Sequence, residues 1–354
     1  MRNHGRLPDA PTIADVAHAA GVSRATAARV LGHYGNVREK TRNLVVDAAR
    51  RLAYRPNQLA KSMATGRSRM IGLVVEAIEN PFSAQAVGLI ADIAGAHGYV
   101  VILATTDGDI ELERDAVRDL LAKQVDGLII APTSSSTIEH LIGASQRGCP
   151  VVLLDRRVPA LRADTFAVDN FCASYDAVNS LIGRGHRNVA LVSKAPIHGE
   201  LSSVTERVDG YRAALRDADI EISLDLILLG AWDTQNLAKQ VRALCVSPTR
   251  PTAFLATDSS VALVLLGVLR KMDLVIPGDV SFVCFDDADW TAAITPPLTV
   301  ISQPVSDLAT AATERLIIRL EGRASGPGVE TLLPATLIHR ASVSDASQRP
   351  AWDG

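Results

Sequence analysis

The chain has 354 residues, of which 47% are hydrophobic and 21% charged, and its formal net charge is −3 at pH 7. This length can bury two ordinary cores beside a small third module. The amino-terminal stretch MRNHGRLPDAPT lacks the apolar core of a secretory signal, and no apolar run approaches the ~18 residues of a membrane span. Secretion and membrane insertion are therefore disfavoured, and we expect a cytoplasmic protein.

The first elements are three short predicted helices between residues 12 and 57. Thr12 is a suitable N-cap for the first helix, which ends at Gly21, and Ser23 caps the second helix at 24–31. The short turn between them is typical of a helix-turn-helix, and a third helix follows at 38–52. The residues expected to pack inside are Ile13, Val16, Ala17, Ala20, Ala27, Ala28, Val30, Leu44, Val45, Ala48 and Leu52.

The second helix would expose Arg24, Ala25, Thr26 and Arg29, side chains that suit a helix lying in the major groove of DNA. The alternative is a small helical bundle with solvated arginines. Charge favours DNA, because residues 1–69 hold 13 of the 36 Lys and Arg residues but 4 of the 39 Asp and Glu residues. A basic head on an acidic body is the electrostatic footprint of a phosphate-binding module.

The spaced pattern DVA…AGVS…T…RVL…V…TR…V…AA…L.YRPN…A resembles the DNA-binding headpiece of the lactose-repressor family, the LacI/GalR type. The resemblance implies that Arg24 and Ala25 stand at the two base-reading positions that vary within the family. It implies a DNA interface made of Thr12, Ser23, Arg24, Ala25, Thr26, Arg29, Asn36, Tyr54, Asn57, Ala60 and Met63.

Pro56 stops the third helix, and Asn57 can cap a short helix at 58–64. Seven residues form a marginal helix in water because nucleation is costly. The resemblance implies a hinge helix that folds on operator DNA, pairs with its dimer mate and carries Met63 where the family has a minor-groove leucine wedge. The alternative for Met63 is an ordinary contact between two hinge helices.

From Met70 onward, apolar runs alternate with helical stretches, a rhythm that predicts parallel sheets covered on both faces. The expected strands are 71–75, 100–103, 127–130, 151–154, 166–168, 189–192, 225–229, 253–256 and 281–284. The expected helices are 83–97, 112–123, 206–216, 236–246, 261–272 and 305–320. The alternation repeats, so it predicts two doubly wound lobes.

The resemblance extends over this region, through NPF, VDGLII, GHRNVALV, ERVDGYRAAL, FDD and PPLTVISQP. It implies a core similar to periplasmic sugar-binding proteins, with two lobes joined by three crossing strands. The implied domains are a head at 1–57, a hinge and linker at 58–69, a core at 70–341 and a flexible tail at 342–354. Lobe 1 would span about 70–168 and 298–323, and lobe 2 about 169–297 and 324–341, with a last strand at 331–339.

A ligand of such a fold lies outside the carboxyl ends of the strands, where the sheets face each other. The expected effector-binding residues are Asn80, Phe82, Asp155, Arg156, Ser193, Arg207, Asp258, Asp286 and Trp290. The family resemblance points most directly to Arg207 and Asp286. Carboxylates, an arginine and aromatic faces suit a sugar, sugar acid or related metabolite.

Other interpretations of these residues stay open. Phe82 could pack inside the first lobe, Asp155 and Arg156 could form a surface ion pair, and Asp258 could cap a helix. The sequence contains no catalytic motif in its required setting, and its scattered carboxylates give only a weak glycosidase signal. A solute-binding protein of an uptake system is the alternative function, but it would need secretion.

Four cysteines lie within or beside apolar segments without metal-ligand spacing, so we expect four buried free thiols and no metal or cofactor: Cys149, Cys172, Cys245 and Cys284. The tail has no leucine heptads, which favours a homodimer over a tetramer. The sequence as a whole predicts a ligand-responsive regulator, a repressor, that binds double-stranded operator DNA at the nucleoid and has no membrane partner.

Overall fold

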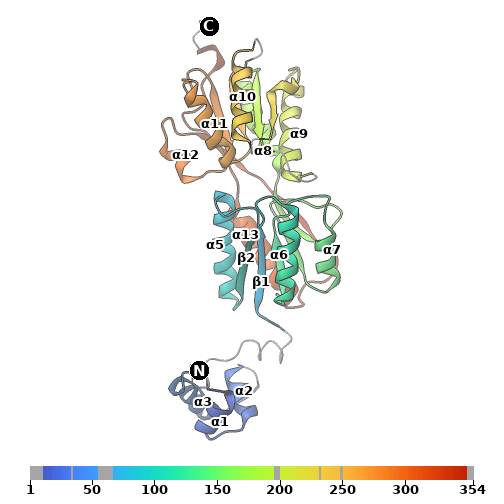
Figure 1. Ribbon diagram of the computed structural model, residues 1–354, viewed down its shortest axis with the longest axis vertical. Helices are drawn as coiled ribbons and strands as arrows, with labels where there is room; N and C mark the ends of the chain where they lie inside the picture. The colour runs from blue at the N-terminus through green and yellow to red at the C-terminus, as the bar shows by residue number, and fades with distance from the viewer. Residues whose placement is uncertain are drawn as a thin grey trace, which may run out of the picture. The chain divides into compact units, whose positions relative to one another are not determined.

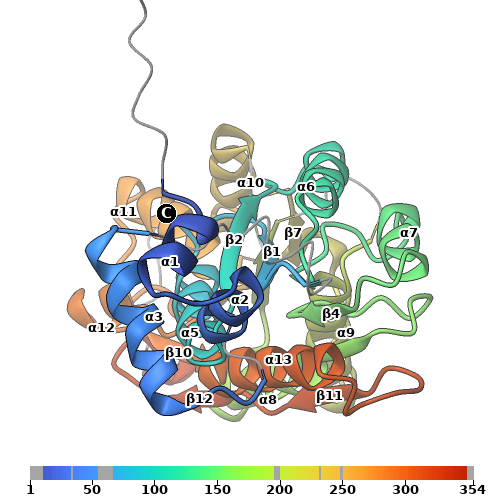
Figure 2. The same cartoon turned by 90° about the horizontal axis from the view of Figure 1, so that it is seen from below.

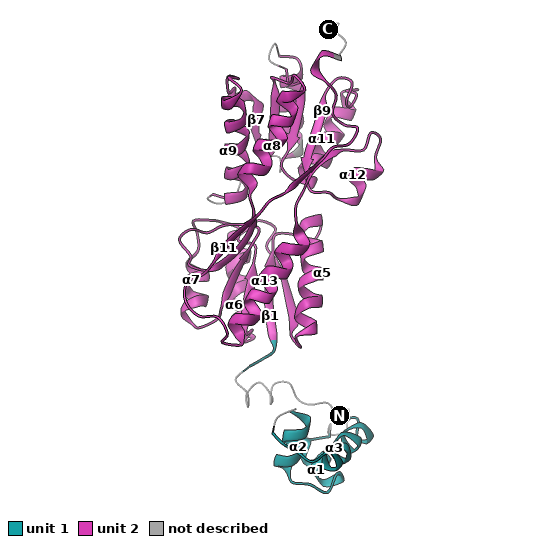
Figure 3. Ribbon diagram, turned by 180° about the vertical axis from the view of Figure 1, so that it is seen from behind, with its two compact units in different colours: residues 1–69 teal, residues 70–354 magenta. Residues whose placement is uncertain are grey.

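The computed structural model describes residues 11–32, 35–54, 67–194, 200–230, 233–247 and 250–348. The chain divides into two units, residues 1–69 and 70–354 (Figure 3). Asn57, Ala60 and Met63, with the predicted hinge helix at 58–64, lie outside the described residues.

Side-chain hydrogen bonds cap the start of the first two of the three helices in the first unit. Helix α1 (Ile13–Ala19) begins with a capping box, in which the Asp15 amide donates to Thr12 Oγ1 at 3.4 Å and the Thr12 amide donates to Asp15 Oδ2 at 2.7 Å. Ser23 caps α2 (Arg24–Leu31) by accepting from the Thr26 amide, and α3 (Glu39–Arg51) follows. This confirms the predicted helix-turn-helix.

The core of the first unit is made of small side chains that let the helices approach closely. Its buried members are Val16, Ala17, Ala20, Ala27, Val30, Val45, Ala48 and Ala49. The prediction was wrong for Leu44, which is 49% exposed, because the inner face of α3 runs through Val45, Ala48 and Ala49.

The first lobe of the second unit is a six-stranded parallel sheet. Its order is β11-β5-β4-β3-β1-β2. The strands are β1 (Met70–Val75), β2 (Val100–Thr105), β3 (Gly127–Ile130), β4 (Val151–Leu154), β5 (Asp164–Val168) and β11 (Glu330–Leu333). On one face lie α6 (Ile110–Ala122) and α7 (Glu139–Gln146), and on the other α5 (Pro81–Ala96) and α13 (Val305–Leu320), as Figure 2 shows.

The second lobe repeats this design with one change (Figure 1). Its strand order is β12-β10-β9-β8-β6-β7, and β12 is antiparallel to β10. The strands are β6 (Val189–Ser193), β7 (Ile227–Leu229), β8 (Ala253–Ala256), β9 (Ser281–Phe285), β10 (Thr299–Ser302) and β12 (Thr336–Ile338). The helices are α8 (Asn170–Gly183), α9 (Ser202–Asp217), α10 (Thr234–Cys245), α11 (Ser259–Lys271) and α12 (Asp289–Ala293).

The chain crosses between the lobes three times, as predicted, but two crossings lie elsewhere than expected. Strand β10 pairs with β9 in the second lobe, so the return to lobe 1 follows Ser302 rather than residue 297. The predicted last strand 331–339 is two strands, β11 beside β5 in lobe 1 and β12 beside β10 in lobe 2, so the final crossing lies between Leu333 and Thr336.

The segment after residue 341 is not a flexible tail over its described part. Ser342 is fully buried, its Oγ donates to the Phe282 carbonyl at 2.6 Å and accepts from the Thr299 amide at 2.8 Å. A short 3-10 turn, η2 (Ala346–Gln348), follows. The predicted strand at 225–229 likewise begins as a 3-10 turn, η1 (Leu224–Leu226), before β7. Among the described residues, no helix combines the length and apolar character needed to cross a membrane.

Candidate DNA-binding and effector-binding sites

The DNA-reading face predicted for the first unit is carried by α2. Arg24, Ala25 and Arg29 are exposed on it, as is Asn36 in the following loop. Arg24 stands at the first position of the helix, where a side chain extends beyond the helix end toward any partner in front of it.

Four other predicted DNA contacts also have structural roles in the head. Thr12 and Ser23 cap the two helices, and the Ser23 and Thr26 hydroxyl oxygens lie 2.9 Å apart. Tyr54 is half-buried against the head's core. These residues therefore fix the geometry of α2 as well as offering polar atoms at its surface.

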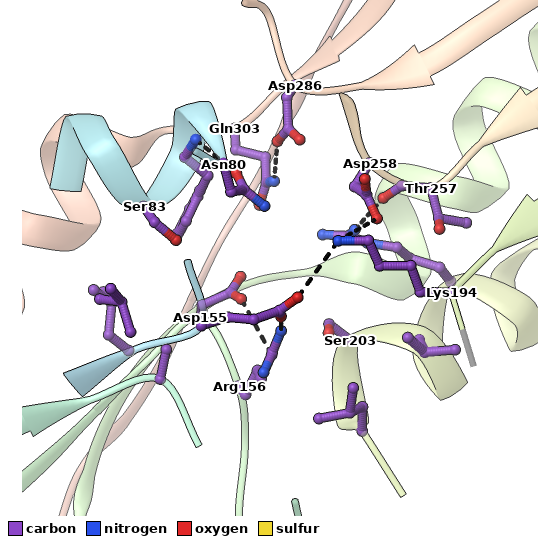
Figure 4. Close-up of a pocket in the computed structure, with 18 of the residues that line it drawn as sticks. Asn80, Ser83, Asp155, Arg156, Lys194, Ser203, Thr257, Asp258, Asp286 and Gln303 are labelled. Atoms are coloured by element: carbon purple, nitrogen blue, oxygen red, sulfur yellow. Dashed lines mark hydrogen bonds and ion pairs between the residues drawn. The ribbon is translucent and has the colours of Figure 1, made fainter. Parts of the chain in front are cut away.

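In the second unit, a pocket lies between the two lobes at the carboxyl ends of their strands, and it encloses about 760 Å³ including the solvent at its mouth. Figure 4 shows charged side chains from both lobes converging on it. Eight of the nine predicted effector residues line it: Asn80, Phe82, Asp155, Arg156, Ser193, Arg207, Asp258 and Asp286.

Trp290 is the predicted residue that the structure places elsewhere. It lies on α12, packs against the buried cluster of α10 and α11, and lines a separate groove with Leu263 and Ile294. The chain lines the pocket at Asp286 and leaves it before α12 begins at Asp289. The pocket consequently has fewer aromatic faces than a sugar site was expected to have.

Glu76 stands at the centre of a charged cluster that joins the lobes. It accepts a hydrogen bond from Arg156 of its own lobe, and its Oε1 lies 3.4 Å from Nζ of Lys194, which belongs to the second lobe. Burial opposes ionisation of Glu76, but the charges of Arg156 and Lys194 outweigh it and lower the pKa of that carboxyl. Asp155 and Arg156 are thus pocket residues rather than a surface pair.

Arg207 projects from α9 and is almost fully buried. Its Nε donates to Asn170 Oδ1 at 2.8 Å, its Nη1 donates to the Thr257 carbonyl, and its guanidinium lies 3.9 Å from the centroid of the Phe285 ring. Burial lowers the pKa of Arg207, although the charges of Asp155, Asp286 and Asp258 act in the opposite direction.

Asp155 and Asp286 follow the ends of β4 and β9 with φ angles of +69° and +73°. Aspartate is one of the few residues other than glycine that adopts this left-handed backbone readily. Asp286 accepts from the Ser259 amide at 3.1 Å and from the Gln303 side-chain amide at 2.6 Å. Each lobe therefore presents one aspartate to the pocket from the same strand-end position.

Two residues, Asp258 and Phe82, have the structural role that was the open alternative and also line the pocket. Asp258 does cap α11, accepting from the Val261 amide at 2.8 Å, and also lines the pocket with Oδ2 3.9 Å from Lys194 Nζ. Phe82 is 8% exposed, packs in the core and also lines the pocket.

Sequence reasoning missed several polar lining residues: Glu76, Ser83, Lys194, Ser203, Thr257 and Gln303. A usable signal existed for four of them, since Glu76, Lys194, Thr257 and Gln303 each stand directly after a strand. The rule that was applied to Asp155 would have found them.

The expectation of four buried thiols was wrong for Cys172, which is exposed at the start of α8. We expect one fast and three slow equivalents when the native protein is titrated with a thiol reagent. Burial raises the pKa of Cys149 to about 11, and thiolates are the reacting species. A Cys172→Ser variant should lose the fast equivalent, and two or more fast thiols in the parent would contradict this assignment.

Comparison with known proteins finds a matching family model for each of the two units. Residues 12–57 match the model of bacterial regulatory proteins of the lacI family, and residues 68–333 match that of periplasmic binding proteins and the sugar-binding domain of the LacI family. The match over residues 12–57 excludes the alternative of a solute-binding protein without a DNA-binding head.

Curated relatives agree with these matches. A probable opine utilization operon repressor of Rhizobium rhizogenes is 74% identical over 185 residues, which cover 51% of this chain and 93% of the relative. The transcriptional regulator KdgR of Bacillus subtilis is 31% identical over 94% of this chain and 97% of its own.

The solved structures that match include a Lac repressor dimer bound to operator and an anti-inducer, with a TM-score of 0.81, 27% identity and coverage of 94% of this chain and 99% of that one. A CelR regulator in complex with cellobiose has a TM-score of 0.69 at 28% identity, again covering 94% of this chain and 99% of its own.

Proposed function

The chain belongs to the LacI family of bacterial regulatory proteins, and we propose that it represses genes for opine use, with an opine as the effector that controls operator binding. Opines are conjugates of an amino acid with a keto acid or a sugar. The observation that carries the proposal is the pocket between the lobes, whose lining includes four carboxylates and three cations. Such a lining suits a charged, polar metabolite better than a neutral one.

We propose that the eight predicted residues in the pocket, together with Lys194 and Gln303, bind this effector. Because they come from both lobes, a bound molecule changes the relative free energy of lobe arrangements that differ in their separation. Operator-bound protein would be associated with the nucleoid.

The test of the proposal is fluorescence anisotropy of labelled operator DNA with the full chain, titrated with opines of both chemical subclasses. A shift in operator affinity with an opine, and none with cellobiose or ribose, supports it. Operator affinity that responds to a sugar and to none of the opines would overturn it.

The DNA-binding role proposed for α2 gives a second prediction. Arg24→Ala should relax base preference at one position of each operator half-site, at a cost of about 1–3 kcal/mol for the preferred base pair. The measurement is competitive binding to an operator library at fixed salt. Lys40→Ala on the exposed face of α3 is the control, and it should weaken binding evenly across sequences or leave it unchanged. Unaltered base preference in Arg24→Ala would contradict the role of Arg24.

We further propose that the chain forms a homodimer through the groove between α11 and α12. The groove is mainly apolar, and Leu263 and Val275 on its rim are 52% and 60% exposed. Exposed apolar surface of this kind marks interaction sites. A second copy is the fitting occupant, because an operator read by paired helix-turn-helix heads needs two chains.

A further inference from the structure

Two buried charges in the pocket, Arg207 and Asp155, have weak or no direct ion pairing within the described part of the chain. The first is Arg207, which is 7% exposed and has its hydrogen bonds to Asn170 and Thr257 directed at neutral oxygens. Within the described residues, no carboxylate oxygen lies within 4.0 Å of its guanidinium nitrogens. A buried guanidinium in this setting has a strong preference for an anion.

The second is Asp155, whose side chain is 15% exposed. Over the described part of the chain, its carboxylate has one ion contact, at 3.5 Å from Nε of Arg156, and accepts no hydrogen bond. Arg156 is committed elsewhere, since its Nη2 donates to Glu76 and its Nη1 to the Pro132 carbonyl at 3.0 Å. Asp155 is thus a carboxylate poorly neutralised by its own lobe.

The remaining carboxylates of the pocket accept hydrogen bonds or contact cations, although Asp286, like Arg207, has only neutral hydrogen-bond partners among the described residues. Glu76 is held by Arg156 and Lys194, Asp258 caps α11, and Asp286 accepts from the Ser259 amide and from Gln303. The two deficits have opposite sign and lie on opposite lobes. Burial raises the pKa of Asp155 and lowers that of Arg207, so each group is held in a setting that disfavours its charged form.

A neutral sugar could supply hydroxyl groups to both side chains, but it would add no opposite charge to either of them. A ligand with a negative group on one side and a positive group on the other would compensate both. Asp155 and Arg207 both line the pocket, so one small molecule in it can contact both side chains.

We propose that the effector is a zwitterion, whose carboxylate is bound by Arg207 of the second lobe and whose protonated amine is bound by Asp155 of the first. This rests on the proposed function in so far as the ligand is the effector, and it adds which residue binds each of the two charged groups. The hydroxyls of Ser83 and Ser203 on the pocket wall are available to a third, polar part of the ligand.

The experiment is calorimetric titration of the full chain with three matched probes. These are an N-(carboxyalkyl) amino acid, its methyl esters and its N-acetylated form, with cellobiose and ribose as neutral sugars. We expect the parent compound to bind, and loss of the carboxylates or of the amine charge to weaken binding about 10- to 100-fold. Binding of a neutral sugar in preference to the zwitterion, equal affinity for all three probes, or no binding of the zwitterion would overturn the proposal.

Two variants test which side chain contacts the amine of the ligand and which contacts its carboxylate. In Asp155→Asn the penalty for N-acetylation should disappear while the penalty for esterification stays, and in Arg207→Lys the esterification penalty should shrink. Asp107→Asn is the control for the first, because Asp107 is an exposed aspartate after β2 with a φ angle of +50° outside the pocket lining. Arg212→Lys, on the same helix as Arg207, is the control for the second. Both controls should keep both penalties.

The ligand series on the parent protein does not depend on whether either variant folds. The outcome also separates this proposal from the proposed function. A zwitterion that binds with both penalties but leaves operator affinity unchanged refutes the regulatory role of the opine, not the recognition. A neutral sugar that binds and shifts operator affinity refutes the zwitterion and keeps the regulation.

Discussion

Replacing Gly210 with alanine should destabilise the second lobe and remove the ligand response together. Gly210 lies on α9 where that helix crosses α8, and a Cβ there would lie 2.2 Å from the carbonyl oxygen of Phe171 and 3.1 Å from the Tyr175 amide nitrogen. These are backbone atoms, so no side-chain rotation relieves the overlap, and the helices must separate. We expect a loss of about 3 kcal/mol in unfolding free energy.

The effect reaches the pocket because Arg207 stands on the same helix three residues earlier. Its hydrogen bonds to Asn170 on α8 and to the Thr257 carbonyl depend on the spacing of the two helices. Ligand affinity should therefore fall even at a temperature where the variant is folded. Thermal denaturation and calorimetric titration measure the two consequences separately.

The control is Gly183→Ala near the end of α8, where an added Cβ would meet no atom within 4 Å. Alanine is favoured over glycine in a helix by about 1 kcal/mol, so this variant should be as stable as the parent or more so. If Gly210→Ala unfolds at the same temperature as the parent, α8 and α9 do not pack as closely at Gly210 as the structure indicates.

The fully buried inner strands were predictable because they are continuous apolar runs, the common sequence form of a buried parallel strand, whereas the edge strands β7, β11 and β12 were not placed correctly. Site residues directly after a strand could be predicted for the same reason, since the strand end fixes where they stand. Asp155 and Asp286 are examples. The rule worked on position alone, without any knowledge of which side chains pair.

Residues farther from a strand end were not predictable in this way. Trp290 is five residues beyond β9, and its direction depends on how α12 packs against α11. The lobe boundaries failed for a related reason. Whether residues 299–302 belong to lobe 1 or lobe 2 depends on their pairing with β9, which is a non-local choice that no local pattern encodes.

Buried charged residues are a third group, and they could not be predicted from the sequence. Lys194 and Glu76 read as ordinary solvated residues in the sequence, because lone Lys and Glu are almost always exposed. Their burial is stable only because the two lobes bring them together, 3.4 Å apart, with Arg156 as a third member. A sequence cannot show a pairing between residues separated by more than a hundred positions unless the fold is already known.

Replacing Leu263 with aspartate should convert the protein to monomers and weaken operator binding by about 100- to 10,000-fold, because a chain with one head loses the gain of paired binding. Leu263 is 52% exposed on α11, so a carboxylate there stays hydrated in the single chain but must be desolvated in a contact between copies. Light scattering would measure the mass, and anisotropy at fixed salt the operator affinity.

Leu112→Asp is the matched control, since Leu112 is an exposed leucine of similar accessibility, 46%, on α6 of the other lobe. It should remain a dimer with the operator affinity of the parent. A dimeric Leu263→Asp variant would place the interface elsewhere, and a monomeric variant with undiminished operator affinity would show that one head suffices. Because the substituted side chain lies outside the pocket lining, calorimetric titration of the monomer also tests whether a single chain holds a complete effector site.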